Sequence, residues 1–478
     1  MPQILDRIFS SNLKTFFLLL GITSLFYSNI LLGGFVFDDN IFIENNTQVK
    51  SLDIAGIYRS STTAGAGLSG DNFYRPNQQL IYATLHALFG LSPFWFHLVS
   101  ILAHVINGFL LFLLFIRIGF ARSQAVFGSA LFLLHPILTQ AVSYVSGLSE
   151  PLVLMSILGT VILFDKSWFV ASAVVFAVGL FSKENQSIAI GLVALLAYFR
   201  YMRGELEAPK KIIVFIFSLL SLSFLYFLFR PGTLDFSSYS APELSTRLLT
   251  FLHVLPQYAK MLFWPLPLYY EKPYTFVPFF TPSSLLSIAL IISGIWASFH
   301  SIVKKRGEIF LGLGWFAVVM TPFLGIVPMN AVYLEHWLYI PIIGIIICLI
   351  YFFDFKKHWP IIFIVLILFG VRITFRNLEW GDPIKFYKNE LRYTDNSARI
   401  YVNLGMEFAE RGDCSSAMSL YRQAIGMNDT YPQTHHNLAV CLEETGDISG
   451  AKEEYLKALK INPYFPYSRA ALEKLLRD

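Results

Sequence analysis

Long apolar segments separated by short polar loops fill the first 377 residues of the chain. A helix needs about 20 apolar residues to cross a hydrocarbon core of about 30 Å. We expect eleven membrane spans, at residues 14–36, 93–117, 122–138, 149–165, 167–182, 184–201, 210–230, 282–302, 307–328, 336–353 and 358–377. The first run is too long for the apolar core of a signal peptide, so we interpret it as a retained span. The pattern therefore predicts an all-α polytopic membrane domain over residues 1–377.

One further apolar segment, residues 245–264, does not fit the alternation of membrane sides. It carries several polar side chains and an internal proline: Arg247, His253, Gln257, Lys260 and Pro256. Counted as a span, it would move the basic residues 304–306 to the outer side. We therefore predict an amphipathic helix on the outer surface. The N-terminus then lies inside, and the C-terminus lies outside.

Charge supports this topology. Lysine and arginine gather in the short loops of one side, which the positive-inside rule assigns to the cytoplasm: Arg7, Lys14, Arg117, Arg122, Lys166, Arg200, Arg203, Lys210, Lys211, Lys304, Lys305, Arg306, Lys356 and Lys357. Only 14% of the residues are charged, against about 25% in soluble proteins, and the mean hydropathy is +0.56. The formal net charge of +4 is too small to suggest a nucleic-acid partner.

The pattern changes after about Arg376, where one motif occurs twice at a spacing of 34 residues. Tyr401-Val-Asn-Leu-Gly405 matches His435-His-Asn-Leu-Ala439, and Ala417, Tyr421, Ala424 and Pro432 match Ala451, Tyr455, Ala458 and Pro466. This period is typical of tetratricopeptide (TPR) repeats. We expect a TPR α-solenoid over residues 378–478, with repeats at about 399–432 and 433–466 and a last helix at 467–477. Residues 380–397 would add an initial helix that docks on the membrane domain.

The three cysteines, Cys348, Cys414 and Cys441, show neither paired nor metal-ligand spacing. Cys414 and Cys441 fall in different repeats, and the sequence leaves open whether they meet.

Two adjacent carboxylates, Asp38 and Asp39, follow the first span and begin a predicted outer loop over about 37–92. Aspartate caps helices well, so the pair could mark a helix start. It could equally form a general base that faces a site at the membrane surface. The sequence alone leaves both interpretations open.

Several polar side chains lie in or beside the apolar spans, where ionisable groups are costly and often functional. Those near predicted outer ends are Glu150, Lys183, Glu184, Glu335, His336 and Arg376, while His97, His104 and His135 lie in or at the ends of spans. Each could be an ordinary interfacial residue, Lys183 could pair with Glu184, and His97 and His104 could bond neighbouring helices. Their gathering on one side would suit a site for a lipid-linked phosphate. No Gly-rich nucleotide loop, His-Glu-x-x-His motif or Gly-x-Ser-x-Gly motif occurs, and we predict no metal site or bound cofactor.

A series of short motifs in order identifies a resemblance. They are Phe35-Val-Phe-Asp-Asp39, Tyr74-Arg-Pro76, Phe96-His-Leu-Val99 with His104, Phe132-Leu-Leu-His-Pro136, Ser182-Lys-Glu184, Glu335-His-Trp-Leu-Tyr-Ile-Pro341 and Arg376-Asn377, followed by the TPRs. This order resembles the transmembrane-and-TPR-containing (TMTC-type) O-mannosyltransferases, of the C-type superfamily of polyprenyl-phosphate-sugar-dependent glycosyltransferases.

The resemblance implies a C-type glycosyltransferase fold with its active site and TPRs at the outer membrane face. Asp38 and Asp39 would be the acidic motif, and one of them, by preference Asp39, would take a proton from the acceptor hydroxyl. Lys183, Arg75 and Arg376 would bind the donor phosphate, with Glu184, His97, His135, Glu335 and His336 as further substrate-binding candidates. The chain departs from the family's pattern at Leu138, Gln140, Leu148 and His336.

We therefore expect a bacterial inner-membrane enzyme that moves a mannose-like sugar from a polyprenyl-phosphate donor. The acceptor would be a Ser or Thr hydroxyl of a polypeptide that the TPRs hold on the periplasmic side. Two alternatives remain: transfer to a surface glycan or lipid, and a non-catalytic membrane scaffold. A transporter is disfavoured because the spans show no internal repeat.

Overall fold

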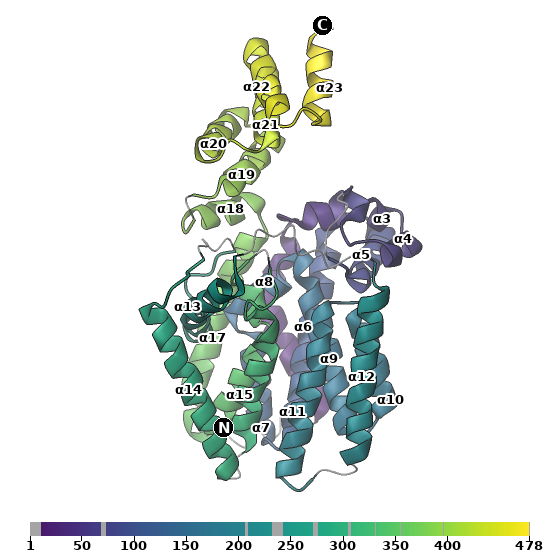
Figure 1. Ribbon diagram of the computed structural model, residues 1–478, viewed down its shortest axis with the longest axis vertical. Helices are drawn as coiled ribbons and strands as arrows, with labels where there is room; N and C mark the ends of the chain where they lie inside the picture. The colour runs from purple at the N-terminus through teal and green to yellow at the C-terminus, as the bar shows by residue number, and fades with distance from the viewer. Residues whose placement is uncertain are drawn as a thin grey trace. The chain divides into compact units, whose positions relative to one another are not determined.

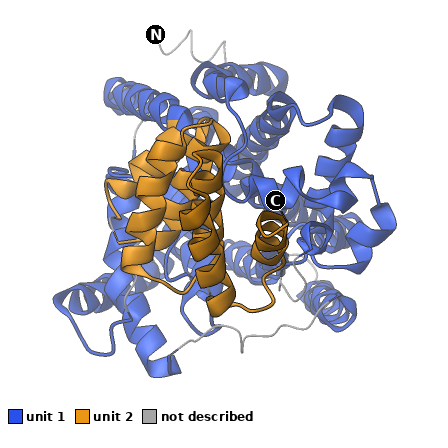
Figure 2. Ribbon diagram, turned by 90° about the horizontal axis from the view of Figure 1, so that it is seen from above, with its two compact units in different colours: residues 1–268, 274–378 blue, residues 269–273, 379–478 orange. Residues whose placement is uncertain are grey.

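The computed structural model describes residues 11–67, 73–205, 209–231, 242–270, 276–304, 307–329, 331–353, 355–394 and 396–477. Arg7, Lys305 and Arg306, which the charge argument uses, and residues 68–72 of the predicted outer loop lie outside these ranges. The regular elements over the described residues are all helical (Figure 1). The chain forms two compact units, one of residues 1–268 and 274–378 and one of residues 269–273 and 379–478 (Figure 2).

The first unit holds the apolar helices. Its long helices are α2 (Asn12–Tyr27, continued by the 3-10 turn η1, Ser28–Leu32), α6 (Pro93–Ile118), α7 (Arg122–Leu133), α9 (Ser149–Asp165), α10 (Phe169–Leu180), α11 (Ile188–Met202), α12 (Pro209–Phe229), α13 (Leu244–Phe263), α14 (Pro282–Val303), α15 (Gly307–Met320), α16 (Ile342–Phe352) and α17 (Phe355–Trp380). Each of the eleven predicted spans overlaps one of these helices, and several of the helices are shorter than the predicted span. Fold class is therefore confirmed as all-α with apolar spans, and the chain is an integral membrane protein.

The number of complete crossings stays a prediction. Six helical segments among the described residues are long and apolar enough to cross a membrane: Asn12–Leu32, Pro93–Ile118, Val145–Asp165, Pro209–Phe229, Pro282–Val303 and Lys357–Trp380. A seventh is possible if α7 and the segment Pro136–Val142, bent by 50° relative to it, form one span. The remaining predicted spans correspond to shorter helices, such as α10 and α16.

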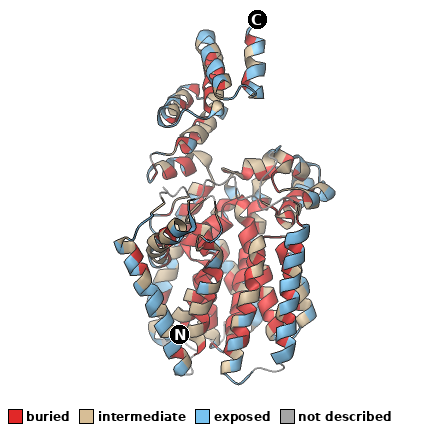
Figure 3. Ribbon diagram, viewed as in Figure 1, coloured by how far each residue is buried: buried red, intermediate tan, exposed pale blue. Residues whose placement is uncertain are grey.

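The centre of the first unit is built on α6 and α9, which pack on each other and are buried along most of their length (Figure 3). By contrast, α14 buries only Ser284, Ser287 and Ser301 and exposes large apolar side chains such as Trp296. An apolar helix with its outer face uncovered is what contact with lipid requires. The burial pattern thus separates central helices from peripheral ones.

The predicted segment 245–264 corresponds to the single helix α13 (Leu244–Phe263), which continues through Pro256 and packs on α14. It buries Phe251, Val254 and Tyr258 on one side and is not among the helical segments apolar enough to span a membrane. This agrees with the predicted amphipathic helix. Its side of the membrane stays a prediction.

An ion-pair network joins one end of several helices. Asp165, at the end of α9, accepts from Arg117 at the end of α6 (2.5 Å) and from Arg200 near the end of α11 (2.9 Å). Arg203 reaches Glu308 in the first turn of α15 at 3.6 Å. Three of the basic residues that the charge argument placed on one side therefore converge at one place.

Further elements precede or join these helices: the π-turn η2 (Asn40–Glu44), α3 (Thr47–Lys50), α4 (Ile54–Arg59), α5 (Pro76–Phe89), η4 (Pro136–Leu138), α8 (Thr139–Val142), η5 (Val145–Leu148), η6 (Glu184–Ser187) and η8 (Glu335–Leu338). Buried apolar residues of η2, α3, α4, α5, α6, η5 and α9 form one cluster, including Ile43, Tyr82, Phe96 and Val145. The predicted outer loop is therefore packed against the helical bundle over its described residues.

The second unit contains α18 (Pro383–Leu391), α19 (Ala398–Glu410), α20 (Cys414–Met427), α21 (Pro432–Glu444), α22 (Ile448–Ile461) and α23 (Pro466–Leu475). Successive helices pack on each other, and the repeat residues Ala417, Tyr421, Ala451 and Tyr455 form the core. Gly412 and Gly446 adopt positive φ angles of 80° and 87° in the turns inside each helix pair. The repeat pattern thus forms the paired helices that a TPR requires.

Candidate active site

Asp39 has no exposed surface and ties the outer loop to the start of α9. Its Oδ1 accepts hydrogen bonds from the main-chain nitrogen (2.8 Å) and hydroxyl (2.5 Å) of Ser146 in η5, and its Oδ2 accepts from the Val36 nitrogen (3.0 Å). Asp39 precedes η2, but its side chain makes no capping bond there. The capping interpretation is therefore wrong for Asp39, because its carboxylate is directed to another part of the chain.

The ionisation of Asp39 is perturbed. Burial raises the pKa of this carboxyl to about 7, although the hydrogen bonds from Ser146 and Val36 act to lower it and the neighbouring Asp38 raises it further. A carboxyl pKa close to the working pH is a common feature of catalytic acids and bases. The main cause of this raised pKa is burial, and its value is compatible with a functional role.

Asp38 is half-buried, in contrast to Asp39. Its carbonyl oxygen accepts bonds from the nitrogens of Ile41 and Phe42, both at 3.0 Å, which fixes the turn. The preceding Phe37 has a φ of 55°, a left-handed conformation that costs a residue other than glycine about 1–3 kcal/mol. The sequence favoured Asp39 as the group that takes the acceptor's proton, and no observation tests this. The exposure of the two side chains favours Asp38 for contact with an acceptor.

Lys183 pairs with Glu150 at the start of α9, and both side chains are buried. The alternative in which Lys183 pairs with Glu184 does not hold. Lys183 is in an extended conformation (φ −166°, ψ 142°), so its side chain and that of the next residue leave the backbone in different directions. The partner comes instead from 33 residues earlier in the chain.

His336 joins this pair from η8. Its Nε2 lies 3.8 Å from the Oε1 atom of Glu150, and its main-chain nitrogen donates to the side-chain oxygen of Gln140 at 2.9 Å. Glu150 also binds Lys183, so His336 lies beside that candidate cation. Gln140 and His336, two of the positions at which the chain departs from the family's pattern, therefore contact each other next to the Lys183–Glu150 pair.

The segment 145–150 connects the acidic and basic groups. Ser146 binds Asp39, and Glu150, four residues later, binds Lys183. Helix α5 holds this segment from the other side, because Gln78 donates to the Ser146 carbonyl (2.9 Å) and Tyr82 donates to the Val145 carbonyl (2.6 Å). Candidate residues that are far apart in the sequence are thereby attached to one short segment.

Arg376 and Glu335 form a second, fully buried pair with 3.6 Å between Nη2 and Oε2. A buried charge is tolerated when it has a partner of opposite sign. Arg376 thus uses at least part of its charge within the protein. Its proposed contact with the donor phosphate stays a prediction.

Arg230 is a candidate that the sequence reasoning missed. It follows the last residue of α12, is 9% exposed, and its guanidinium lies 6.0 Å from the Tyr74 ring. Tyr74, the residue before Arg75, lies in turn beside Tyr226 of α12, with 6.2 Å between the ring centroids. An arginine directly after an apolar span, at its predicted outer end, is the signal that could have identified it.

The histidines of the spans are mainly held by the protein itself. His104 contacts the Tyr339 hydroxyl (2.8 Å) and the Leu133 carbonyl (3.1 Å), as expected for a helix-bridging residue. His135 contacts the Leu262 carbonyl at 2.9 Å through Nε2 and accepts from the Ile137 nitrogen through Nδ1. His97 lies 3.4 Å from the Gly34 carbonyl. Substrate contacts by His97 and His135 stay predictions.

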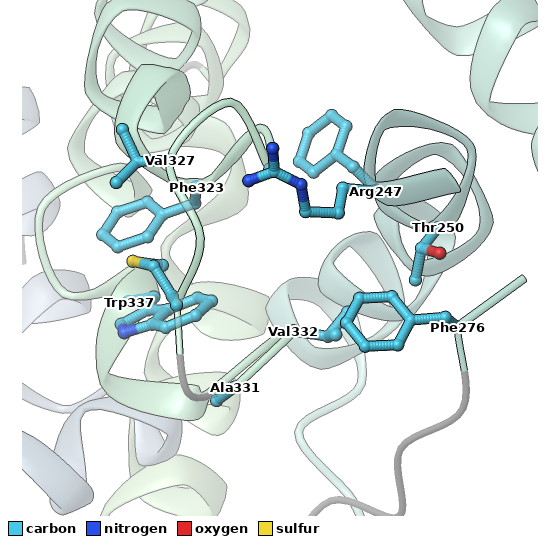
Figure 4. A pocket seen from close by; sticks show the side chains of 11 residues that line it. Arg247, Thr250, Phe276, Phe323, Val327, Ala331, Val332 and Trp337 are labelled. Carbon is cyan, nitrogen blue, oxygen red and sulfur yellow. The ribbon is translucent and has the colours of Figure 1, made fainter. Parts of the chain in front are cut away.

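A separate, small pocket with a cavity volume of about 30 Å³ lies beside η8 (Figure 4). Trp337, the residue after His336, stacks on Phe323 at 4.6 Å and forms one wall. Arg247 of α13 lies on another side and donates to the Ile326 carbonyl at 3.2 Å. The pocket contains none of the candidate site residues, so we do not include it in the site.

Over the described ranges, no group of three or more His, Cys, Asp or Glu side chains could hold a metal ion. The arrangement instead supplies a carboxylate pair, several cations and hydrogen-bond donors. Such groups can bind a phosphate, accept a proton and stabilise developing negative charge.

Comparisons with known proteins agree with the motifs. Residues 432–465 match the tetratricopeptide repeat family. The chain is 24% identical over 472 residues to the human protein O-mannosyl-transferase TMTC3, a match that covers 86% of this chain and 51% of that protein. It is 24% identical to the mouse protein O-mannosyl-transferase TMTC4, covering 87% of this chain and 67% of the relative, and 24% identical to the Caenorhabditis elegans protein O-mannosyl-transferase F38B6.6, covering 87% and 63%.

The chain spans about half the length of TMTC3. The matches nevertheless cover 86–87% of this chain, so they include residues of both compact units. The resemblance of this chain to the TMTC-type protein O-mannosyltransferases is therefore confirmed.

Proposed function

We propose that the chain is a membrane glycosyltransferase that moves a mannose-like sugar from a polyprenyl-phosphate-linked donor to a hydroxyl acceptor, a Ser or Thr of a polypeptide. The observation that carries this proposal is the attachment of Asp39 and Lys183 to the same segment, 145–150. A carboxylate pair for the acceptor and cations for a phosphate thus share one neighbourhood. The relatives are named protein O-mannosyl-transferases, which supports the same class of reaction.

In the proposed reaction, the acceptor oxygen attacks the anomeric carbon and the bond from that carbon to the phosphate oxygen breaks. Asp38 takes the hydroxyl proton, while Asp39 fixes the turn through its three hydrogen bonds. Arg75, Lys183 and Arg230 are the candidates that offset the charge developing on the departing polyprenyl phosphate. Attack opposite the leaving group inverts the anomeric centre.

The site would face the outer side of the membrane. The positive-inside rule supports this, since the Arg117, Arg200 and Arg203 network lies at the cytoplasmic end in the predicted topology. With a bacterial host, the site and the TPR unit would be periplasmic. The TPR helices would then hold the acceptor polypeptide or a partner protein.

The direct test incubates purified chain in lipid with radiolabelled polyprenyl-phosphate sugars and a mixture of unfolded polypeptides. We expect label to move from a mannosyl donor onto polypeptide. Asp38→Asn should lower the rate at least 100-fold, which is the lower range for loss of a general base. Asp53→Asn is the matched control, because Asp53 lies in the same loop but only caps α4 by accepting from the Gly56 nitrogen at 2.9 Å.

Other outcomes identify the alternatives. Label on a glycan or lipid acceptor would replace the polypeptide with that acceptor. If the wild-type chain consumes none of the donors and Asp38→Asn folds normally, the result supports a non-catalytic scaffold. Full activity of Asp38→Asn would rule out its role as the base.

A further inference from the structure

Two cysteines meet in the core of the TPR unit. Cys414 is the first residue of α20 and Cys441 lies in α21, and their sulfur atoms are 2.7 Å apart. Both are buried, with exposed fractions of 6% and 1%. They are separated by 27 residues and belong to successive repeats. This meeting is the point that the sequence left open.

The local structure explains the meeting. Asp413 caps α20 by accepting from the Ser416 nitrogen at 3.0 Å, which directs Cys414 to the same buried face as Ala417 and Tyr421. Helix α21 packs on α20 and buries Cys441 together with Leu438. The two sulfur atoms are thus brought together by the repeat packing itself.

Metal binding and nucleophilic catalysis, the other common roles of cysteine, fit this pair poorly. The Oε2 atom of Glu444 lies 3.1 Å from the Cys414 sulfur, but no group of three or more ligands among the described residues could hold a metal ion. Burial raises the pKa of the Cys414 thiol, and the Glu444 carboxylate raises it further. A buried thiol beside a carboxylate is a poor nucleophile, since the thiolate is the reactive form.

We propose that Cys414 and Cys441 are joined by a disulfide bond that links the two TPR repeats. The proposal rests on the outer location of the TPR unit in the proposed function, because disulfides persist in oxidising compartments. The oxidant would be a disulfide-carrying thiol oxidoreductase of that compartment. One cysteine thiolate attacks its disulfide, and the second cysteine then attacks the mixed disulfide, so that two cysteine thiols are oxidised and one dithiol is released.

The bond would form during translocation, before the two side chains are buried. It would close a loop across α20 and α21 in an array of only a few helices. A TPR array of this size has little core, so a covalent link between repeats is of most use here. Restricting the unfolded chain should raise the unfolding temperature of this unit by on the order of 10 °C relative to the reduced form.

The test uses the whole chain in membranes of its producing cells. Free thiols are blocked with an alkylating reagent under denaturing conditions, and the chain is digested with trypsin without reduction. Cleavage after Arg411, Arg422 and Lys452 places the two cysteines on separate peptides, residues 412–422 and 423–452. We expect these peptides joined by a disulfide and released by a reductant. Cys348, in α16, should carry the alkyl group in the same sample and serves as the internal control.

Alkylated Cys414 and Cys441 in the unreduced sample would overturn the proposal. Protease digestion of intact spheroplasts shows whether residues 378–478 are outside, and sugar transfer is measured on the same membranes. Reduced cysteines in an outer TPR unit with active transfer would refute the disulfide alone. A TPR unit that is protected from the protease would refute the proposed topology. Absence of sugar transfer would refute the proposed function. Cys414→Ala should remove the linked peptides and lower the unfolding temperature to that of the reduced wild-type chain.

Discussion

The carboxylate of Asp39 and the hydroxyl of Ser146 form a 2.5 Å hydrogen bond between residues 107 positions apart. The main-chain nitrogen of Ser146 donates to the same oxygen at 2.8 Å. Glu150, four residues after Ser146, holds Lys183. A substitution of Ser146 therefore tests whether the ionisation of Asp39 depends on the segment 145–150, which also holds Lys183.

We expect Ser146→Ala to move the acid limb of the transfer rate to higher pH. The wild-type rate should rise with pH through about 7, because the three donors around Asp39 match its ionised form and its pKa is about 7. The Ser146 hydroxyl lowers that pKa, so its removal raises the pH at which Asp39 ionises. The measurement is the rate of sugar transfer from pH 5 to 9.

Ser143→Ala provides the comparison. Ser143 lies on the same stretch and donates to the Asn377 side chain at 2.6 Å, with no bond to Asp39. Its pH profile should follow that of the wild type. Identical profiles for Ser146→Ala and Ser143→Ala would show that Asp39 ionisation does not govern the reaction.

The helices were predictable because their signals are local. The predicted span at 149–165 coincides with α9, and the 34-residue period predicted the helices α19 to α23. The prediction was poorer at 336–353, where α16 begins only at Ile342. An apolar stretch shows where a helix can lie, but here the turn η8 occupies its first residues and presents His336 to Glu150.

The sequence predicted which residues belong to the candidate site, but it predicted few of the contacts between them. Asp39, Lys183 and His336 were identified from position and motif, but no local pattern pairs Asp39 with Ser146 or Lys183 with Glu150. These contacts depend on how distant segments pack. The alternative of a Lys183–Glu184 pair does not hold for this reason, since adjacent side chains of an extended backbone point in different directions.

Variants of the Lys183–Glu150 ion pair should distinguish an effect on stability from an effect on donor binding. Lys183→Met leaves a buried carboxylate without its lysine, which typically costs about 3–5 kcal/mol. We expect a lowered unfolding temperature for this variant. The double variant Lys183→Met with Glu150→Leu should recover most of the stability, because both charges are removed. Its KM for the donor should remain raised if Lys183 binds the phosphate. A wild-type KM in the stable double variant would make Lys183 a structural residue only.

Arg230 should contribute to donor binding. A hydrogen bond to a charged group contributes about 1.5–3 kcal/mol, which corresponds to roughly a 10–100-fold change in binding. Arg230→Gln should therefore raise KM for the polyprenyl-phosphate sugar by about that factor, with a smaller change in kcat. Arg247→Gln is the control, because Arg247 donates to the Ile326 carbonyl beside the separate pocket. Equal KM values for the two variants would contradict the assignment of Arg230.

Two glycines of the TPR unit offer a matched pair of stability predictions. A Cβ atom at Gly405 would lie 2.5 Å from Cε1 of the buried Tyr421, so Gly405→Ala forces the repeat core apart. We expect a loss of about 1–3 kcal/mol in the free energy of unfolding. A Cβ atom added at Gly426, in α20, would have no other atom within 4 Å. Gly426→Ala should therefore raise the free energy of unfolding by about 0.5–1 kcal/mol. Native-state hydrogen exchange of α19 and α20 in the whole chain measures both. A destabilised Gly426→Ala or a neutral Gly405→Ala would contradict the packing.

A buried histidine makes the TPR unit sensitive to pH. His435 contacts Glu454 through Nδ1 and Asp429 through Nε2, both at 2.5 Å. The hydrogen bond to Glu454 is the main cause that raises the pKa of His435 above its usual value, despite burial, and Asp429 adds to the effect. The charged imidazolium is therefore favoured in the folded state over the unfolded state.

The sign of the pH dependence follows from this raised pKa. The stabilisation should be complete below the unfolded pKa of about 6.5 and should be lost as pH rises through the higher folded pKa. Hydrogen exchange of α21 and α22, corrected for the intrinsic rate, should therefore show weaker protection at pH 8.5 than at pH 6. His435→Gln should have weaker protection at pH 6 and little further loss at pH 8.5, because it has no charge to lose. His436→Gln is the control, since His436 contacts the Ser468 hydroxyl at 3.1 Å and no carboxylate contact is described for it. Protection in the wild type that rises with pH would contradict the proposed charge on His435.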